Sequence, residues 1–153
     1  QLTGAYNRVY FDKYIERLVL LNKSNDKKTG IIFFDIDHFK SVNDTHGHDI
    51  GDKILQAMVQ IIKTNIRNSD KLIRWGGEEF ILIIPVNSID EVSKQAEKLR
   101  LIIANNEFQT VKNITCSFGV TLHNDLSDIK ASVKIADEKL YQAKGQGRNQ
   151  VIF

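Results

Sequence analysis

Apolar residues recur along this chain with two different spacings, and these spacings predict which segments are helices and which are strands. A spacing of three to four residues, typical of amphipathic helices, predicts helices over residues 8–21, 49–66, 89–103 and 129–143. Short apolar or alternating runs predict strands over residues 30–34, 71–75, 80–84, 114–121 and 149–153. Asn7 is a suitable N-cap for the first helix, and Ser88 with Glu91 forms a capping box for the third.

The order of these elements favours one fold class. Between residues 31 and 121 the order is strand, helix, strand, strand, helix, strand. This is the ferredoxin-like (βαββαβ) arrangement of the α+β class, with its helices on one face of an antiparallel sheet. Residues 30–34 are apolar on both faces, so we expect a central strand that is covered on both sides. Residues 23–29 are polar and are expected to form a solvated loop.

The composition and net charge indicate how many domains to expect and which partners are not expected. A chain of 153 residues with 42% apolar and 26% charged residues is expected to form one domain with its own core. A net charge of +2 gives no reason to expect nucleic acid or an anionic membrane as a partner. The only cysteine, Cys116, lies in an alternating strand, where we expect a small buried side chain.

The ends of the sequence and its hydropathy bear on where the protein acts. No apolar run approaches the roughly 20 residues of a membrane span, and no signal peptide is visible, so we expect a cytoplasmic segment that does not insert into a membrane. The chain begins at Gln1 rather than at a methionine. We therefore expect residues 1–153 to be one domain of a longer multidomain or membrane-anchored protein, with a regulatory region upstream.

Two acidic clusters stand at the ends of predicted strands. The run Gly76-Gly77-Glu78-Glu79 separates two strands, and a Gly-Gly pair predicts a tight hairpin because glycine reaches positive φ at little steric cost. Asp35 follows a buried strand, where an unpaired carboxylate is unfavourable. If these acids meet, they form a hard-oxygen site suited to Mg²⁺. Taken alone, the Gly-Gly-Glu-Glu run is more typical of a solvated turn, and an Asp-x-Asp more often caps a strand or begins a helix.

Five groups of motifs, in order, resemble the GGDEF domain of diguanylate cyclases in its GGEEF form. The resemblance covers nearly the whole chain, and the family usually has leucine where this chain has Ala5. The matching motifs are Leu2-Thr3-Gly4-Ala5-Tyr6-Asn7-Arg8; Asp35-Ile36-Asp37-His38-Phe39-Lys40; Asn43-Asp44, Gly47-His48 and Gly51-Asp52; Arg74-Trp75-Gly76-Gly77-Glu78-Glu79-Phe80; and Ala136-Asp137, Leu140-Tyr141, Ala143-Lys144 and Gly147-Arg148-Asn149.

The resemblance implies a fold and a reaction. The expected fold is the ferredoxin-like core with extra N- and C-terminal elements, akin to polymerase palm and class III nucleotide cyclase catalytic domains. The expected reaction condenses two GTP molecules into 3′,5′-linked cyclic di-GMP and releases two pyrophosphates. Because each domain of this family holds one GTP, catalysis requires a homodimer in which two sites face each other. Residues 1–153 are then a single GGDEF-type catalytic domain.

The resemblance also assigns a metal site. Asp35 and Glu78 match the main metal ligands, and the backbone carbonyl of Ile36 matches a further oxygen ligand. Glu79 matches either another ligand or a group near the attacking hydroxyl, and the sequence does not separate these roles. Two Mg²⁺ ions per site, or two Mn²⁺ ions, would lower the pKa of the hydroxyl and stabilise the leaving pyrophosphate.

Phosphate binding is assigned to two places in the chain. Backbone amides of His38, Phe39 and Lys40 would lie in a short turn after the first acidic strand and could cradle the β- and γ-phosphates. Lys144 and Arg148 match the family's phosphate-binding lysine and arginine. At the end of a helix these two cations are also typical of a C-cap that compensates the helix dipole.

Guanine binding and product binding complete the assignment. Asn43 and Asp52 match the residues that meet the guanine edge, where a carboxylate accepts from N1–H and the 2-amino group, which adenine lacks. Asp52 near a helix start is also a favourable partner of the helix dipole. Arg67 and Asp70 match an Arg-x-x-Asp inhibitory site for cyclic di-GMP, with Arg74 as a further contact. The same pattern is also typical of a surface ion pair.

Three functions compete for this sequence. The first is an active diguanylate cyclase, the second is a catalytically silent receptor for GTP or cyclic di-GMP, and the third is a structural dimerisation module. Silent members of the family usually lack signature acids, whereas Asp35, Glu78 and Glu79 are all present here. A dimerisation module would require neither these acids nor the guanine-binding pair. The sequence therefore favours the enzyme.

Overall fold

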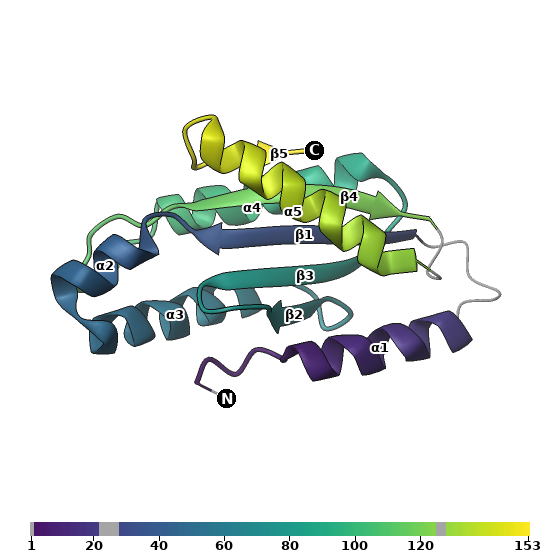
Figure 1. Cartoon of the computed structure of the whole chain (residues 1–153), viewed down its shortest axis with the longest axis horizontal. Coiled ribbons are helices and arrows are strands. Elements are labelled where there is room, and N and C mark those ends of the chain that lie inside the picture. The colour runs from purple at the N-terminus through teal and green to yellow at the C-terminus, as the bar shows by residue number, and fades with distance from the viewer. Residues whose placement is uncertain (1, 22–27, 125–127) are drawn as a thin grey trace.

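A sheet with strand order β2-β3-β1-β4-β5 organises the chain (Figure 1). The computed structural model describes residues 2–21, 28–124 and 128–153. The strands are β1 (Lys28–Ile36), β2 (Lys71–Arg74), β3 (Glu79–Val86), β4 (Cys116–His123) and β5 (Val151–Ile152). The helices are α1 (Arg8–Leu21), α2 (Phe39–His46), α3 (His48–Lys63), α4 (Ile89–Ala104) and α5 (Ile129–Gly145).

The predicted ferredoxin-like core of the α+β class is confirmed. Strand β1 pairs antiparallel with both β3 and β4, and β2 pairs antiparallel with β3. Apart from the short helix α2, which was not predicted and precedes α3, the segment from β1 to β4 has the predicted order of elements. The added strand β5 pairs parallel with β4, so the complete sheet is mixed rather than antiparallel.

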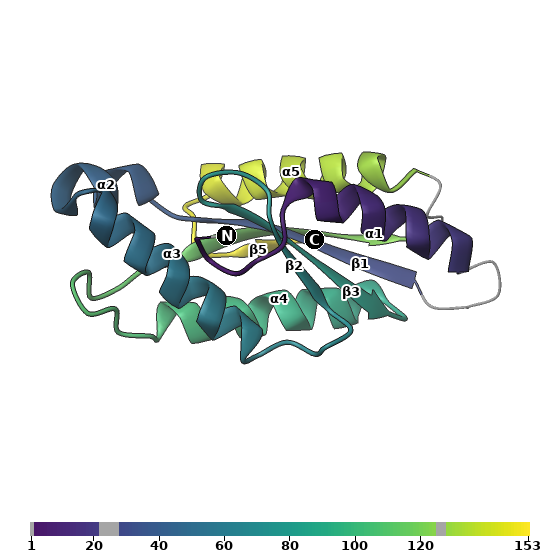
Figure 2. The same cartoon turned by 90° about the horizontal axis from the view of Figure 1, so that it is seen from below.

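Helices cover both faces of the sheet, as Figure 2 shows. Helices α3 and α4 lie on one face, and the added helices α1 and α5 lie on the other. Each face has its own apolar cluster: Phe34 packs with Met58 and Leu99 on the first, and Phe33 packs with Phe11 and Leu140 on the second. Every residue of β1 after Lys28 is consequently buried, which confirms the prediction of a doubly covered central strand.

Asn7 and Ser88 are N-caps, as predicted. The side chain of Asn7 accepts a hydrogen bond from the Tyr10 amide at 2.9 Å, and the Ser88 hydroxyl accepts one from the Glu91 amide at 3.3 Å. Cys116 is fully buried, as expected. In the described part of the chain, no helix is both long enough and apolar enough to cross a bilayer.

Several element boundaries differ from the prediction. Helix α3 ends at Lys63 rather than near residue 66, because the Thr64 hydroxyl and the Asn65 side-chain amide donate to the Gln60 and Ile61 carbonyls and close the helix. Strand β1 begins at residue 28, inside the predicted loop 23–29, of which residues 23–27 lie outside the described residues.

Helix α5 approaches β4 closely, and this approach positions the C-terminal part of the chain. At Gly119 a Cβ atom would overlap the Ala136 carbonyl oxygen and the Leu140 amide nitrogen, so only glycine fits without a shift of the helix. The Lys139 ammonium donates to the Val120 carbonyl at 2.9 Å across the same contact. The end of α5 is thereby held over the end of β1.

Candidate functional site

Asp35 is the most deeply buried acid of the predicted site. It lies within β1, one residue before the strand ends, and not beyond the strand as predicted. Its register partners are Glu79 in β3 and Ser117 in β4, and residues opposed in antiparallel strands point to the same face of the sheet. That face carries α5, and Asp35 is only 2% exposed beneath it.

The charge of Asp35 is only partly compensated. Its Oδ2 atom forms an ion pair with the Lys144 ammonium of α5, whereas its Oδ1 atom is buried and has no hydrogen-bond partner. Burial raises the pKa of Asp35 to about 6; the Lys144 ammonium opposes this rise, and the negative charges of Asp37 and Glu78 add to it. Glu78 therefore lies close enough to Asp35 for their charges to interact.

The loop that carries Glu78 differs from the predicted two-glycine hairpin. Strand β2 ends at Arg74 and β3 begins at Glu79, and the Glu79 carbonyl accepts from the Trp75 amide at 2.8 Å and from the Gly76 amide at 3.2 Å. Neither Gly76 nor Gly77 has a positive φ, so the predicted reason for placing two glycines in this turn is wrong. A Cβ at Gly76 would lie 2.6 Å from the Glu79 Oε2 atom, the flexible end of a side chain, so this contact does not by itself require glycine.

Two arginines hold this loop in place. Arg74 donates to the Gly77 carbonyl from Nε at 3.0 Å and from a terminal nitrogen at 2.7 Å. Arg8 donates to the Trp75 carbonyl at 2.8 Å, and its guanidinium lies 4.1 Å from the centre of the Trp75 ring. The positioning role of Arg8 was not predicted, and its only signal was its place in the opening motif. Arg74 was predicted as a product contact, but its side chain is engaged with the loop.

Asp37 belongs to one of the matching motifs but was assigned no role from the sequence, and the structure gives it one. Its carboxylate accepts from the Thr115 hydroxyl at 2.7 Å, the Ser117 hydroxyl at 2.6 Å and the Asn149 amide at 3.1 Å. These bonds tie the end of β1 to β4 and to the turn that follows α5. Asp37 is therefore committed to holding the site together rather than to an ion.

The predicted phosphate-binding turn is the start of a helix. His38 has a φ of 56°, in the left-handed region, and α2 begins at Phe39. The amides of His38 to Lys40 thus lie at a helix N-terminus, which favours an anion. Phe39 is buried, whereas Lys40 is exposed.

The predicted guanine-binding residues lie where α2 meets α3. The Asn43 Oδ1 atom is buried without a hydrogen-bond partner and lies against Gly51, where a Cβ would overlap it. Asp52 follows Gly51 in α3 and is exposed. The fold thus brings the two predicted residues to the same helix junction.

The two predicted phosphate cations near the end of α5 are placed differently. Lys144 points to Asp35 and is one third exposed, at 33%. Arg148 lies in an exposed turn with a φ of 63°, and its amide donates to the Ala143 carbonyl at 2.9 Å. The helix-end bond of Arg148 agrees with the predicted capping role, and its exposed side chain faces solvent.

Arg67 and Asp70 contact each other through the Arg67 backbone. The Asp70 carboxylate accepts from the Arg67 amide at 2.9 Å, and the Asp70 amide donates to the Arg67 carbonyl at 3.0 Å. Both residues line a pocket of about 260 Å³ that Lys94 and Lys98 of α4 also line. These two lysines were not predicted, because only the fold of α4 against β3 brings them there. Arg74 is not among the residues that line this pocket.

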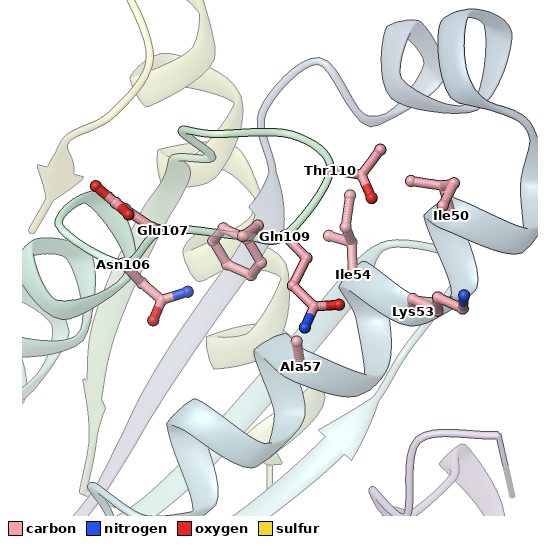
Figure 3. A pocket seen from close by; sticks show the side chains of 9 residues that line it. Ile50, Lys53, Ile54, Ala57, Asn106, Glu107, Gln109 and Thr110 are labelled. Atoms are coloured by element: carbon pink, nitrogen blue, oxygen red, sulfur yellow. The ribbon is translucent and has the colours of Figure 1, made fainter.

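A further pocket of about 310 Å³ lies between α3 and residues 106–110, as Figure 3 shows. Ile54 and Phe108 are among its apolar lining residues, and Lys53, Glu107 and Gln109 are among its polar ones. None of the predicted site residues lines this pocket.

The predicted acids are gathered but are not arranged as a complete set of ligands. Asp35 and Glu79 are register partners, and Glu78 is close to Asp35. Among the residues that the structure describes, no three side chains of His, Cys, Asp or Glu already form a metal-binding group. The ammonium of Lys144 lies against Asp35 instead.

Proteins with similar sequences are known. Response regulator PleD of Caulobacter vibrioides is 37% identical over 158 residues, which cover 99% of this chain and 35% of that protein. Diguanylate cyclase A of Treponema denticola is 38% identical over 148 residues, or 93% of this chain and 40% of that protein. The chain thus spans little more than a third of the length of these relatives.

A solved structure and a family model extend the comparison. The crystal structure of the GGDEF domain of DgcB from Caulobacter crescentus, in complex with c-di-GMP, has a TM-score of 0.89 and 29% identity, and the match covers 99% of this chain and 92% of that one. The family model described as "Diguanylate cyclase, GGDEF domain" matches residues 1–150. The chain therefore belongs to the GGDEF-domain family of diguanylate cyclases.

Proposed function

We propose that this chain is the catalytic domain of a diguanylate cyclase, which condenses two GTP molecules into 3′,5′-linked cyclic di-GMP and releases two pyrophosphates. The observation that carries the proposal is the buried, partly compensated Asp35 beside the loop of Glu78. A relative named as a diguanylate cyclase and a similar domain solved with c-di-GMP support it. Silent members of this family usually lack the signature acids, which this chain retains.

The residues at the end of β1 fit a divalent cation. The Asp35 Oδ1 atom is buried without a partner, Glu78 is close by, and carboxylate oxygens are the ligands that Mg²⁺ prefers. Asp35, Glu78, Glu79 and the Ile36 carbonyl would hold two Mg²⁺ or Mn²⁺ ions. Bound there, the metal supplies acidification of the 3′-hydroxyl and neutralisation of phosphate charge.

The chain's own groups would orient the nucleotide. Amides at the N-terminus of α2 and the side chains of Lys144 and Arg148 would bind the phosphates. Asn43 and Asp52 would bind the guanine edge, and the buried, unpartnered Oδ1 of Asn43 supports this role because a guanine N–H would satisfy it. An adenine base lacks the matching donors and would leave these acceptors unpaired.

The proposed reaction requires a second copy of the chain. One site holds one GTP, so the hydroxyl of each GTP must reach the phosphorus of the other across a homodimer. Residues 1–153 would then be one catalytic domain of a longer cytoplasmic or membrane-anchored protein, whose upstream region regulates how two copies meet.

Product inhibition is a further part of the proposal. The pocket of Arg67 and Asp70 would bind cyclic di-GMP, with Asp70 on a guanine edge and Arg67 on a phosphate or a guanine edge. Lys94 and Lys98 add positive charge to the same pocket, which suits the two phosphates of the product.

The activity is tested with purified protein at high concentration, GTP and Mg²⁺. We expect cyclic di-GMP and pyrophosphate, and Glu78→Ala should lower the rate at least about a hundredfold because it removes a ligand that stabilises transition-state charge. Glu107→Ala, a change at an exposed residue, is the matched control and should keep the wild-type rate. Tight GTP binding without any turnover would favour the silent receptor and contradict the proposal.

The inhibitory site is tested by adding cyclic di-GMP to the same assay. Arg67→Ala should raise the concentration for half inhibition about tenfold or more, because it removes a charged contact worth at least about 1.4 kcal/mol. The initial rate without product should stay close to the wild-type rate. Arg17→Ala, on the exposed side of α1, is the control. Unchanged inhibition in Arg67→Ala would refute this assignment.

Because the pKa of Asp35 is raised, the stability of the metal-free protein should depend on pH. Its pKa in the folded chain, about 6, lies above the ordinary value of 3.8. Between pH 3.8 and about pH 6 the folded chain therefore binds more protons than the unfolded chain. The free energy of unfolding should therefore fall as pH rises through this window, by on the order of 2–3 kcal/mol relative to Asp35→Asn. Urea denaturation in EDTA from pH 4 to 7 measures this difference. Parallel pH profiles of the two proteins would contradict the prediction.

A further inference from the structure

Lys144 supplies the positive charge closest to Asp35. The two side chains form an ion pair in which the Asp35 side chain is almost fully buried and the Lys144 side chain is 33% exposed. The second carboxylate oxygen of Asp35 is buried and has no hydrogen-bond partner. A buried carboxylate without a compensating charge is strongly unfavourable, so this ammonium is needed as long as no other cation contacts Asp35.

The ion pair brings together two groups that the proposed reaction assigns to different ligands. Asp35 is a proposed metal ligand, and Lys144 is a proposed phosphate ligand. The Lys144 ammonium contacts the Asp35 Oδ2 atom and so occupies one of the oxygens that would bind the metal. Its positive charge would also repel a divalent cation bound beside it. The pair must therefore open before Asp35 can bind a metal ion with both oxygens.

The surrounding structure restricts which group moves. Asp35 lies in the central strand, and the end of α5 is fixed by the close approach at Gly119. The following turn is fixed as well, because the Arg148 amide donates to α5 and the Asn149 amide donates to Asp37. The Lys144 side chain is partly exposed and carries a flexible four-carbon stem, so it can leave by rotation of its own bonds.

We propose that Lys144 is a built-in counter-ion of the metal site, which a divalent cation displaces from Asp35. This inference rests on the proposed function, since it takes Asp35 as a metal ligand. The displaced ammonium becomes available for the phosphates of the nucleotide. The metal releases Lys144 from Asp35, and the released Lys144 can bind a phosphate of the nucleotide. Binding of the metal and binding of the nucleotide therefore favour each other.

The exchange is tested on the wild-type chain by amine acetylation and mass spectrometry. Reactivity of Lys144 is compared in EDTA, in saturating Mg²⁺ alone, and in Mg²⁺ with a non-hydrolysable GTP analogue. We expect Mg²⁺ alone to raise the reactivity of Lys144 and the nucleotide analogue to lower it again. Lys139 is the internal control, because it lies on the same helix and donates to a backbone carbonyl.

A variant gives a second measurement. If the ion pair is about 90% formed without metal, it weakens apparent metal binding about tenfold, so Lys144→Met should bind Mn²⁺ about tenfold more tightly than wild type. Lys134→Met, at an exposed position on the same helix, should bind Mn²⁺ like wild type. Circular dichroism establishes that each variant is folded, and if Lys144→Met is not folded, the acetylation experiment decides.

The outcomes separate the two proposals. If Mn²⁺ titration shows binding while Mg²⁺ leaves the reactivity of Lys144 unchanged, the counter-ion exchange is wrong and the proposed metal site stands. The exchange is also wrong if folded Lys144→Met binds Mn²⁺ no more tightly than wild type. If the wild-type chain binds no divalent cation even with the GTP analogue, both proposals fail.

Discussion

The structure depends on one constraint, which is the burial of a carboxylate at the end of its central strand. Asp35 is buried because β1 is covered on both faces and α5 extends over its last residues. In such surroundings a carboxylate requires a cation, and the ammonium of Lys144 meets that requirement without metal. The same requirement makes this end of the sheet a strong position for a divalent ion.

The elements around Asp35 serve to bring distant segments to this one position. Asp37 ties β1 to β4 and to the turn after α5. Arg8 and Arg74 hold the loop of Glu78 from two sides. These contacts join the first residues, the hairpin and the C-terminal helix, so the proposed site is built from nearly the whole length of the domain.

Much of this arrangement could be predicted from the sequence. Periodicity indicated the element order and hence the fold class. The resemblance placed Asp35, Glu78 and Glu79 in one site, and the structure puts Asp35 opposite Glu79 in register and within reach of the charge of Glu78. The missed features depend on tertiary contacts. Neither the ion pair of Asp35 with Lys144 nor the place of Lys94 in a pocket is visible in local sequence. The hairpin between β2 and β3 was predicted correctly, but its reason was wrong, because neither Gly76 nor Gly77 has the positive φ that two glycines suggested.

The central claim is that acids from β1 and from the hairpin hold divalent ions against the phosphates of GTP. Crystals grown with Mn²⁺ and a non-hydrolysable GTP analogue test it most directly, because the anomalous scattering of manganese locates each ion. The account predicts an anomalous peak in contact with both Asp35 and Glu78, beside the nucleotide phosphates. Clear density for the nucleotide with no anomalous peak at these two side chains would contradict it.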